Sequence, residues 1–519
     1  MKNTENIGVV NYPDRSDKTS TPLFINNLTV FLLTIAAFVF FVCLTGGGKA
    51  PHIYQAIGEF VAKRNYYPIW IVFLPIIGGF VSISFGRKYE NLRDALTVIF
   101  TFITLIMVMS MYPLVAKGNI ILNLPRVLGY GLLFKIDMLS FIMAILTSIL
   151  WLMAMIYAPN YMAFENHRNR FYLCAAITYG AILGTVMAGD VFTMFLFFEA
   201  MTFSSYMLVV HCETEEAIIA GGSYIYMAIF GGLCILLGMI LLYIHTGTLE
   251  FNPLISQIVS MGNTRYSVMA LFMVGFGVKA GMVPLHIWLP KAHPVAPTPA
   301  SALLSGIMIK VGGYGMLRTS TSFFFPLLKE IGGINDILWL SSKNLGAVII
   351  WMGIATMGIG VFMALQQGNM KRMLAYHSVS QMGYVILGIG VASYLGYHGP
   401  MGFTGGVFHM INHALFKSLL FMVAGAVYLQ TQHLDMYKMG GFWKKMPFTA
   451  LVALIAALGI TGTPLFNGFA SKTLLHHAIV EAYEYGHPSF KYAEYLFILI
   501  SACTVTSFIK LISFTFLGK

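Results

Sequence analysis

Charged side chains stand in the middle of long apolar stretches of this 519-residue sequence. A carboxylate, Glu199, lies in FLFFEAMTFSSY, and four similar stretches each contain one lysine: Lys279, Lys310, Lys417 and Lys472. A charged side chain at the centre of a membrane helix costs about 2.5–3.5 kcal/mol on insertion scales, so each one needs a partner, a wet cavity or a function. Snorkelling or a static ion pair accounts for one such lysine, but it accounts poorly for a set spread over different helices.

Lysine suits proton transfer, because burial lowers the pKa of an ammonium group from about 10.4 and a neighbouring carboxylate raises it again. Glu199 is the only carboxylate near the centre of an apolar segment, so it is the natural partner for one lysine. A Glu–Lys pair that opens and closes would switch that lysine between its charged and neutral forms.

His409, His413 and Lys417 recur every four residues and therefore share one helix face. Two histidines at this spacing could bind a metal ion. A cationic lysine on the same face opposes metal binding, and no carboxylate ligand lies nearby in the sequence. A line of proton-carrying side chains bridged by water fits the pattern better, with static hydrogen bonding as the plainer alternative.

The composition indicates what must position these residues. Hydrophobic residues make up 58% of the chain and charged residues 10%. A soluble protein of this length could not bury so much apolar surface, so we expect an all-α polytopic membrane protein. A hydrocarbon core of roughly 30 Å needs about 20 apolar residues per helix. This predicts about fourteen transmembrane helices, near 22–45, 68–86, 93–116, 137–157, 170–188, 190–210, 216–245, 266–290, 296–319, 347–366, 372–395, 402–428, 447–482 and 492–517.

The net charge of +11 could indicate nucleic-acid binding, but the basic residues are scattered over short loops, as the positive-inside rule predicts for a membrane protein. If every segment spans, the side that holds both termini carries the larger share of the 31 Lys and Arg residues. We therefore expect both termini in the cytoplasm and the chain in the cytoplasmic membrane of a prokaryote. The apolar run at 22–45 is too long for a signal-peptide core and is interpreted as a retained helix.

No cofactor motif is apparent. The sequence has no Walker loop, and the glycines of GIGVASYLG lie in an apolar helix without a preceding strand. The cysteines show no CxxC or other close ligand spacing, so we expect neither a metal nor a cofactor in this chain. The five are Cys43, Cys174, Cys212, Cys234 and Cys503.

Two apolar segments contain helix-breaking residues at mid-membrane depth. Gly281 and Pro284 interrupt the first, and Pro464 interrupts the second, 447–482, ahead of Lys472. Backbone groups freed by such a break are tolerated in a membrane only when they are buried in protein or line a wet cavity. Both breaks are therefore predicted to lie beside functional groups.

A pair of interrupted segments in corresponding positions is typical of an inverted-repeat transporter. IMIKVGGYGML also resembles SFIKLISFTFL, which aligns Lys310 with Lys510. We expect two inverted five-helix repeats, each containing one broken helix. The chain would then divide into 1–67 (polar tail, extra helix and loop), 68–169 (N-terminal helices), 170–319 (first repeat) and 347–517 (second repeat).

From about residue 68 onward the sequence resembles the antiporter-like subunits shared by complex I, membrane-bound hydrogenases and Mrp-type cation/proton antiporters. The most specific match is VKAGMVPLHIWLPKAHPVAPTPASALLSGIMIKVGGYGMLR. GDVFTMFLFFEAM, MKRMLAYHSVSQMGY, HMINHALFKSLLF and GTPLFNGFASKTLL also match in order. The resemblance implies that redox cofactors, where present, belong to neighbouring subunits.

The resemblance also implies a role for each matched position. Glu199 and Lys279 would form a gating ion pair, and Lys310 would be the central proton carrier of the first half. His409, His413 and Lys417 would carry protons along the mid-membrane axis, and Lys472 would be the carrier near the exit. Auxiliary groups are expected at His286, His293, His377 and Lys510.

The chain also departs from the family pattern. The helix at 22–45 precedes the usual start, and the sequence stops at SFTFLGK, where many relatives continue into another helix. A neighbouring subunit would then cover that surface. His377 stands where the family commonly has Ser or Thr and would add a proton-binding group.

The sequence therefore predicts a proton-translocating membrane subunit, with Na⁺ coupling left open, of a redox-driven complex I-like or hydrogenase complex. Membrane and peripheral subunits would be its partners. Such a chain pumps ions for an oxidoreductase complex without itself catalysing the redox reaction. The nearest alternative is a subunit of an Mrp-type Na⁺/H⁺ antiporter. A haem- or quinone-binding redox protein is a weaker alternative, because His409 and His413 share one helix whereas haem ligands converge from facing helices. An unrelated solute transporter is weaker still.

Overall fold

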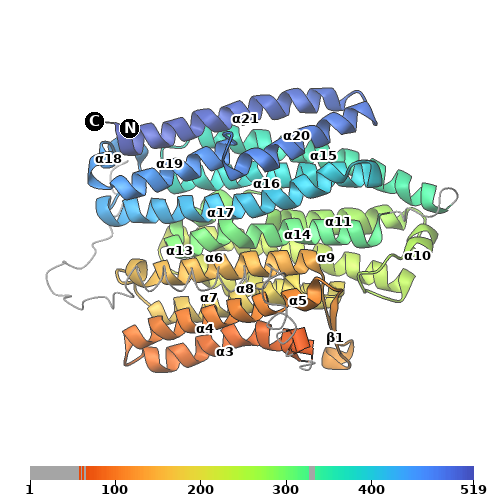
Figure 1. Cartoon of the computed structure of the whole chain (residues 1–519), viewed down its shortest axis with the longest axis horizontal. Coiled ribbons are helices and arrows are strands. Elements are labelled where there is room, and N and C mark those ends of the chain that lie inside the picture. The colour runs from red at the N-terminus through yellow and green to blue at the C-terminus, as the bar shows by residue number, and fades with distance from the viewer. Residues whose placement is uncertain (1–57, 60, 63–65, 326–333, 519) are drawn as a thin grey trace.

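A computed structural model describes residues 58–59, 61–62, 66–325 and 334–518 of the chain. Most of these residues are helical, and the long helices lie side by side with roughly parallel axes (Figure 1). Ten of the helices in the described part are long and apolar enough to cross a membrane. The prediction of a helical, multi-pass membrane protein is confirmed. The helix predicted at 22–45 lies outside the described residues.

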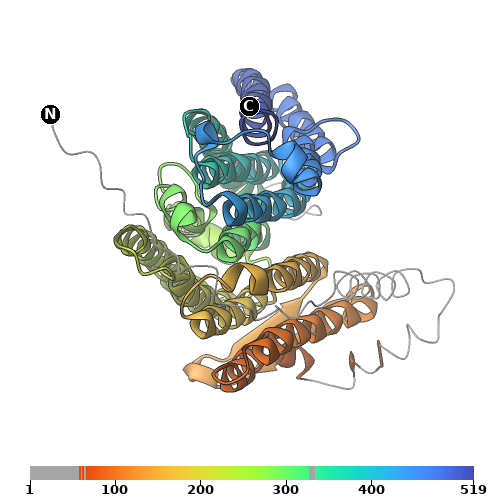
Figure 2. The same ribbon diagram turned by 90° about the vertical axis from the view of Figure 1, so that its left-hand side faces the viewer.

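Seen along the helix axes, the N-terminal helices lie on one side of the molecule and the last helices lie on the opposite side (Figure 2). The first group is α3 (Tyr67–Gly86), α4 (Glu90–Ser110), α5 (Tyr112–Val115), α6 (Met138–Met162), α7 (Arg168–Val186), α8 (Val191–Val209), α9 (Glu215–Thr246) and α10 (Ile255–Ser260). The second group is α11 (Thr264–Ala280), α12 (Leu289–Val295), α13 (Thr298–Leu303), α14 (Ile309–Phe323), α15 (Ile334–Leu365), α16 (Met370–Leu395), α17 (Pro400–Thr431), α18 (Phe442–Lys445), α19 (Pro447–Thr461), α20 (Asn467–Glu484) and α21 (Phe490–Ile512).

One end of the helical bundle carries a short β-hairpin. Strands β1 (Ile120–Leu124) and β2 (Leu132–Ile136) pair antiparallel, with Ile120 opposite Ile136. A bridge from Phe134 to Ala188 joins the hairpin to the end of α7. We call this the hairpin end; the other end of the bundle carries α18 and the chain's C-terminus (Figure 1).

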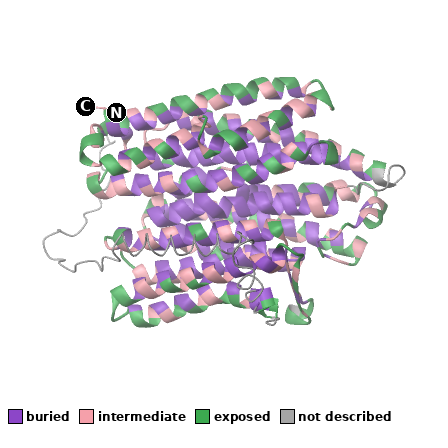
Figure 3. Ribbon diagram, in the orientation of Figure 1, coloured by how far each residue is buried: buried purple, intermediate pink, exposed green. Residues whose placement is uncertain are grey.

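The centre of the bundle is the most enclosed part (Figure 3). Every residue of the apolar windows in 298–323 and in 370–398 is buried, whereas the outer helices expose many apolar side chains. A helix enclosed on all sides is expected to hold the polar groups of a membrane protein, because lipid cannot satisfy them.

Glycines let three central helices approach closely. A Cβ atom at Gly312 of α14 would lie 2.5 Å from the Ala280 nitrogen and 2.6 Å from the Phe276 oxygen of α11. A Cβ atom at Gly306 would collide with the Ser418 hydroxyl of α17. Small residues at such contacts are the usual means by which membrane helices pack. They bring the helices of Lys279, Lys310 and Lys417 together.

Both predicted helix interruptions are present. Helix α11 ends at Ala280, Gly281 follows with φ +74°, and α12 begins only at Leu289. Helix α19 ends at Thr461, and Gly462 follows with φ +80°. Glycine adopts this left-handed backbone at no steric cost, so it ends each helix cleanly.

Side chains satisfy backbone groups that the first interruption frees. The indole nitrogen of Trp288 donates to the Val278 carbonyl at 2.9 Å, and the Val283 amide donates to the Thr356 hydroxyl of α15 at 3.1 Å. The same indole ring packs edge-on against Tyr224, with 4.9 Å between ring centres. The interruption is therefore held by protein contacts.

Replacing Trp288 with phenylalanine should lower the thermal stability of the purified protein. The ring packing is largely kept, but the buried Val278 carbonyl loses one of its two donors and keeps only the Gly281 amide at 3.2 Å, which costs about 0.5–1.5 kcal/mol. The midpoint of thermal unfolding in detergent measures the effect. Trp351→Phe on the more exposed α15 surface is the matched control, and equal midpoints for both variants would contradict the assigned capping contact.

Candidate functional site

Lys279 is almost fully buried in the last turn of α11. Its ammonium group donates to the hydroxyl of Tyr224 on α9 and, at 3.3 Å, to the hydroxyl of Thr202 on α8. It also lies 5.8 Å from the ring centre of Phe198. Two hydroxyls and two aromatic rings therefore surround this cation.

Glu199 lies one turn before Thr202 on α8, on the same face, because residues three apart in a helix are neighbours. Its carboxylate packs against Gly232 of α9, where a Cβ atom would collide with Oε1. Oε1 is buried and has no hydrogen-bond partner among the described residues. The structure places Glu199 within a turn of the group that Lys279 contacts, but it shows no ion pair between the two, which stays a prediction.

Lys310 is fully buried directly after a turn of π-helix at Leu304–Met308. Its ammonium group donates to the carbonyl of Ser305 within that turn. A π turn interrupts the regular backbone hydrogen bonds and often marks a functional site. It makes a carbonyl available to the lysine inside the fully buried part of the bundle.

Two serine residues lie between Lys310 and Lys417. The hydroxyls of Ser305 and Ser378 lie 2.6 Å apart, and Ser378 also donates to the Leu374 carbonyl at 3.0 Å. The ammonium group of Lys417 donates to the same Leu374 carbonyl at 2.6 Å. The two central lysines, on α14 and α17, are therefore linked through the carbonyl and the hydroxyl of Ser305 and then through Ser378 and the Leu374 carbonyl of α16.

His409 and Lys472 meet at Tyr384 of α16. The ring centres of His409 and Tyr384 are 5.2 Å apart, and the Lys472 ammonium group lies 5.1 Å from the tyrosine ring centre. His409 also contacts Ser471 at 3.0 Å and Gln381 at 3.2 Å. Lys472 donates to the carbonyl of Thr461, the last residue of α19, at 3.3 Å. The second helix interruption therefore also lies beside a buried lysine.

His413 lies between these two clusters. Its ring is 6.2 Å from that of His409, and neither of its nitrogens contacts another described residue by a hydrogen bond. A buried imidazole without a protein partner needs water. The arrangement agrees with the predicted single face of α17.

The four auxiliary positions differ in their surroundings. His293 is buried, stacks on Phe421 at 4.6 Å and, like His377 beside Phe508, has no hydrogen-bond partner in the described part of the chain. His286 lies half-buried in the first interruption. Lys510 instead donates to the carbonyls of Leu365 and Gln367 at the end of α15, both at 2.9 Å. Lys510 therefore caps the C-terminal end of a helix, where the helix dipole stabilises a positive charge.

The uncharged hydroxyl and amide side chains of the site were not predicted from the sequence. Single hydroxyls and amides are common in membrane helices and carry no signal of their own. No spacing rule connects them to a lysine on another helix. They are Thr202, Tyr224, Ser305, Ser378, Gln381, Tyr384 and Ser471.

Residues 188–494 match the transmembrane family described as NADH:quinone oxidoreductase/Mrp antiporter. The chain belongs to this family. Residues 128–172 also match the N-terminal region of chain 5 of NADH-ubiquinone oxidoreductase (complex I). The predicted resemblance is confirmed.

Relatives in this family are subunits of larger membrane complexes. The chain is 33% identical to hydrogenase-4 component B of Escherichia coli over 74% of its own length and 57% of that protein. It is 29% identical to a Na⁺/H⁺ antiporter subunit of Alkalihalophilus pseudofirmus, over 78% of its length and 80% of that protein. The chain thus spans little more than half of the hydrogenase component.

A similar structure occurs in the membrane-bound sulfane sulfur reductase, an archaeal respiratory membrane complex. The TM-score is 0.74 at 27% identity, over 86% of this chain and 70% of the matched chain.

Among the described residues no group of three His, Cys, Asp or Glu side chains lies together that could hold a metal ion.

Proposed function

We propose that this chain is the proton-translocating membrane subunit of a redox-driven complex, of the complex I-like or membrane-bound hydrogenase type. The observation that carries the proposal is the buried series of polar groups between Lys310 and Lys417, which consists of the carbonyl and hydroxyl of Ser305, the Ser378 hydroxyl and the Leu374 carbonyl. Two lysines on one such network provide proton-binding groups at membrane depth, where an unused charge is costly. The similarity to hydrogenase-4 component B supports the redox-driven interpretation.

In this proposal protons follow the buried groups in sequence. Glu199 pairs with Lys279 in one state and releases it in another. The Lys279 ammonium group therefore alternates between the Glu199 carboxylate and the Tyr224 hydroxyl. Lys310 receives the proton, and the serine pair leads to Lys417. From there His413, His409 and Tyr384 lead to Lys472 near the second helix interruption. Water bridges the imidazoles that lack a protein partner.

The proposed architecture is that of about fourteen membrane helices with two inverted repeats at 170–319 and 347–517, preceded by helices at 68–169. The two interrupted helix pairs, α11–α12 and α19–α20, support the repeats, because each lies beside a buried lysine. Basic residues in the first turns of helices at the C-terminal end of the bundle support a cytoplasmic location of that end in a prokaryotic membrane. They include Arg168 of α7, Lys371 of α16 and Lys444 of α18.

The redox chemistry is assigned to partner subunits, and this chain is proposed to hold no cofactor. Mass spectrometry of the proteins that co-purify with the tagged chain in mild detergent tests this. Iron–sulfur subunits together with nickel or flavin subunits are the expected partners. Finding only small membrane proteins without redox cofactors would overturn the redox-driven interpretation in favour of an Mrp-type Na⁺/H⁺ antiporter, the alternative that the similarity to the Alkalihalophilus pseudofirmus protein supports.

Glu199→Gln should reduce proton transport by at least about tenfold, since a positioned proton-transfer group contributes about 10²–10⁴-fold. The amide keeps the shape of the carboxylate but cannot stabilise the Lys279 cation. Acidification of inverted membrane vesicles, followed with a pH-sensitive dye, measures transport. Glu216→Gln on the exposed first turn of α9 is the control, and wild-type transport by Glu199→Gln would remove Glu199 from the pathway.

A further inference from the structure

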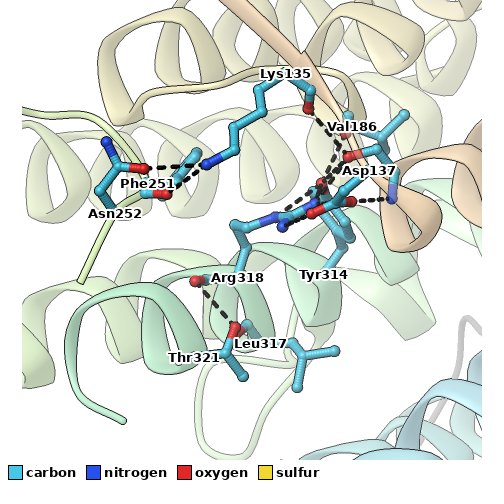
Figure 4. Close-up of polar contacts among 10 residues, drawn as sticks. Lys135, Asp137, Val186, Phe251, Asn252, Tyr314, Leu317, Arg318 and Thr321 are labelled. Atoms are coloured by element: carbon cyan, nitrogen blue, oxygen red, sulfur yellow. Dashed lines mark hydrogen bonds and ion pairs between the residues drawn. The ribbon is translucent and has the colours of Figure 1, made fainter. Parts of the chain in front are cut away.

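Besides the buried lysines and histidines described above, a second polar cluster lies at the hairpin end, around Arg318 (Figure 4). Arg318 of α14 forms a two-pronged ion pair with Asp137, the residue that caps the start of α6, with nitrogen–oxygen distances of 2.5 and 2.8 Å. The same guanidinium donates to the Ser140 hydroxyl at 2.8 Å. The cluster joins the hairpin and α6 to α14.

Lys310, Tyr314 and Arg318 recur every four residues and therefore share one face of α14. All three are buried. This stripe leads from the central lysine at mid-membrane depth to the hairpin end. A buried line of proton-binding groups that reaches an aqueous surface would let protons escape from Lys310 without being pumped.

The hydroxyl of Tyr314 is held so that it cannot pass a proton along this stripe. It donates to the Val186 carbonyl at 2.7 Å and accepts from two nitrogens of Arg318 at 2.8 and 3.1 Å. Its single proton and both lone pairs are thereby engaged at shorter distances than the 3.2 Å that separates this hydroxyl from that of Ser140. Ser140, the next hydroxyl, also accepts from Arg318.

Arg318 contributes a permanent positive charge at this point. A guanidinium is not deprotonated in proteins, so it accepts no proton from Tyr314. Although burial works to raise it, the pKa of Asp137 is lowered to about 2 by hydrogen bonds and charge from Arg318. The carboxylate is therefore ionised, and it accepts hydrogen bonds from both terminal nitrogens of the guanidinium. Beyond them Lys135, held by Phe251 and Asn252, adds a second cation (Figure 4).

We propose that Arg318 is an electrostatic barrier that closes the hairpin end of the Lys310 stripe to protons. Fixed positive charges exclude protons and cations from other membrane pores by the same physics. The inference rests on the proposed proton transport by Lys310. It assigns Asp137 a different task, which is to hold the guanidinium in place.

A leak assay separates a charge barrier from a simple structural anchor. The full chain, purified with its co-purifying partners, is reconstituted in liposomes that contain a pH-sensitive dye. A pH gradient is imposed without any redox substrate, and the rate of its decay is measured. The variants are Arg318→Gln, Arg318→Lys, Asp137→Asn and the double variant Asp137→Asn/Arg318→Gln.

Arg318→Gln and the double variant should leak at least about tenfold faster than the wild type, the factor that a barrier lower by about 1.4 kcal/mol produces. Asp137→Asn keeps the guanidinium and should leak at nearly the wild-type rate. Arg318→Lys replaces the guanidinium with a group that can release a proton, so it should leak faster than the wild type and more slowly than Arg318→Gln. The double variant leaves no unpaired buried charge, so its fold is the least disturbed. If Asp137→Asn does not assemble, Arg318→Lys decides: an anchoring ion pair survives this change and predicts the wild-type leak, whereas a barrier that needs a group without a releasable proton predicts a faster leak.

Two results would overturn the barrier. The first is equal leak in Asp137→Asn and Arg318→Gln, which is the result for an anchoring ion pair. The second is a wild-type rate of pH-gradient decay in both variants that carry Arg318→Gln. Failure of the proposed function would look different: the wild-type complex, supplied with its redox substrate, would then move no protons at all.

Discussion

Lys279→Ala should reduce proton transport by at least about tenfold while the complex still assembles, since a positioned proton-transfer group is worth about 10²–10⁴-fold. The ammonium group lies between α8, α9 and α11 and is held by two hydroxyls. Without this ammonium group, no cation can alternate between the Glu199 carboxylate and those two hydroxyls. The first half of the pathway then lacks the proposed switch. Dye-detected acidification of inverted vesicles measures the loss.

Assembly should survive, because Lys279 contacts side chains of neighbouring helices and does not satisfy the interrupted backbone, which Trp288 and Thr356 do. Lys445→Ala, on an exposed short helix, is the control and should transport normally. Wild-type transport by Lys279→Ala would exclude the gating role. Loss of the complex from the membrane would show that the residue is structural.

Lys310→Ala should be at least as damaging, because no other lysine reaches the Ser305 carbonyl in the described structure. Alanine also leaves a cavity in one of the two most enclosed helices of the described structure, so two further variants separate charge from packing. Lys310→Met keeps most of the volume without a charge. Lys310→Arg keeps the charge but cannot release a proton.

Both Lys310→Met and Lys310→Arg should fail in the same vesicle assay by at least about tenfold. Normal transport by Lys310→Met would mean that the position needs only volume, and normal transport by Lys310→Arg would mean that it needs only a fixed charge. Lys510→Ala is the comparison, since Lys510 caps α15: it should lower thermal stability with little effect on transport.

The membrane class, both helix interruptions and the family could be predicted from the sequence alone. These are local properties: apolar length decides whether a segment can span, and Gly281 or Pro464 breaks a helix whatever lies beside it. The cost of a buried charge likewise attaches to Lys279 and Lys310 individually. For this reason the candidate proton-binding lysines and histidines were found without a structure.

The connections between these residues were decided only by the tertiary structure. Lys310 and Lys510 stand in similar sequence, yet one binds a π turn at the centre and the other caps a helix end. The serine pair that links the lysines, and the pairing of Arg318 with Asp137, join residues 73 and 181 positions apart. Such contacts depend on how glycine-lined helices pack and rotate against each other, and no local pattern in the sequence records that.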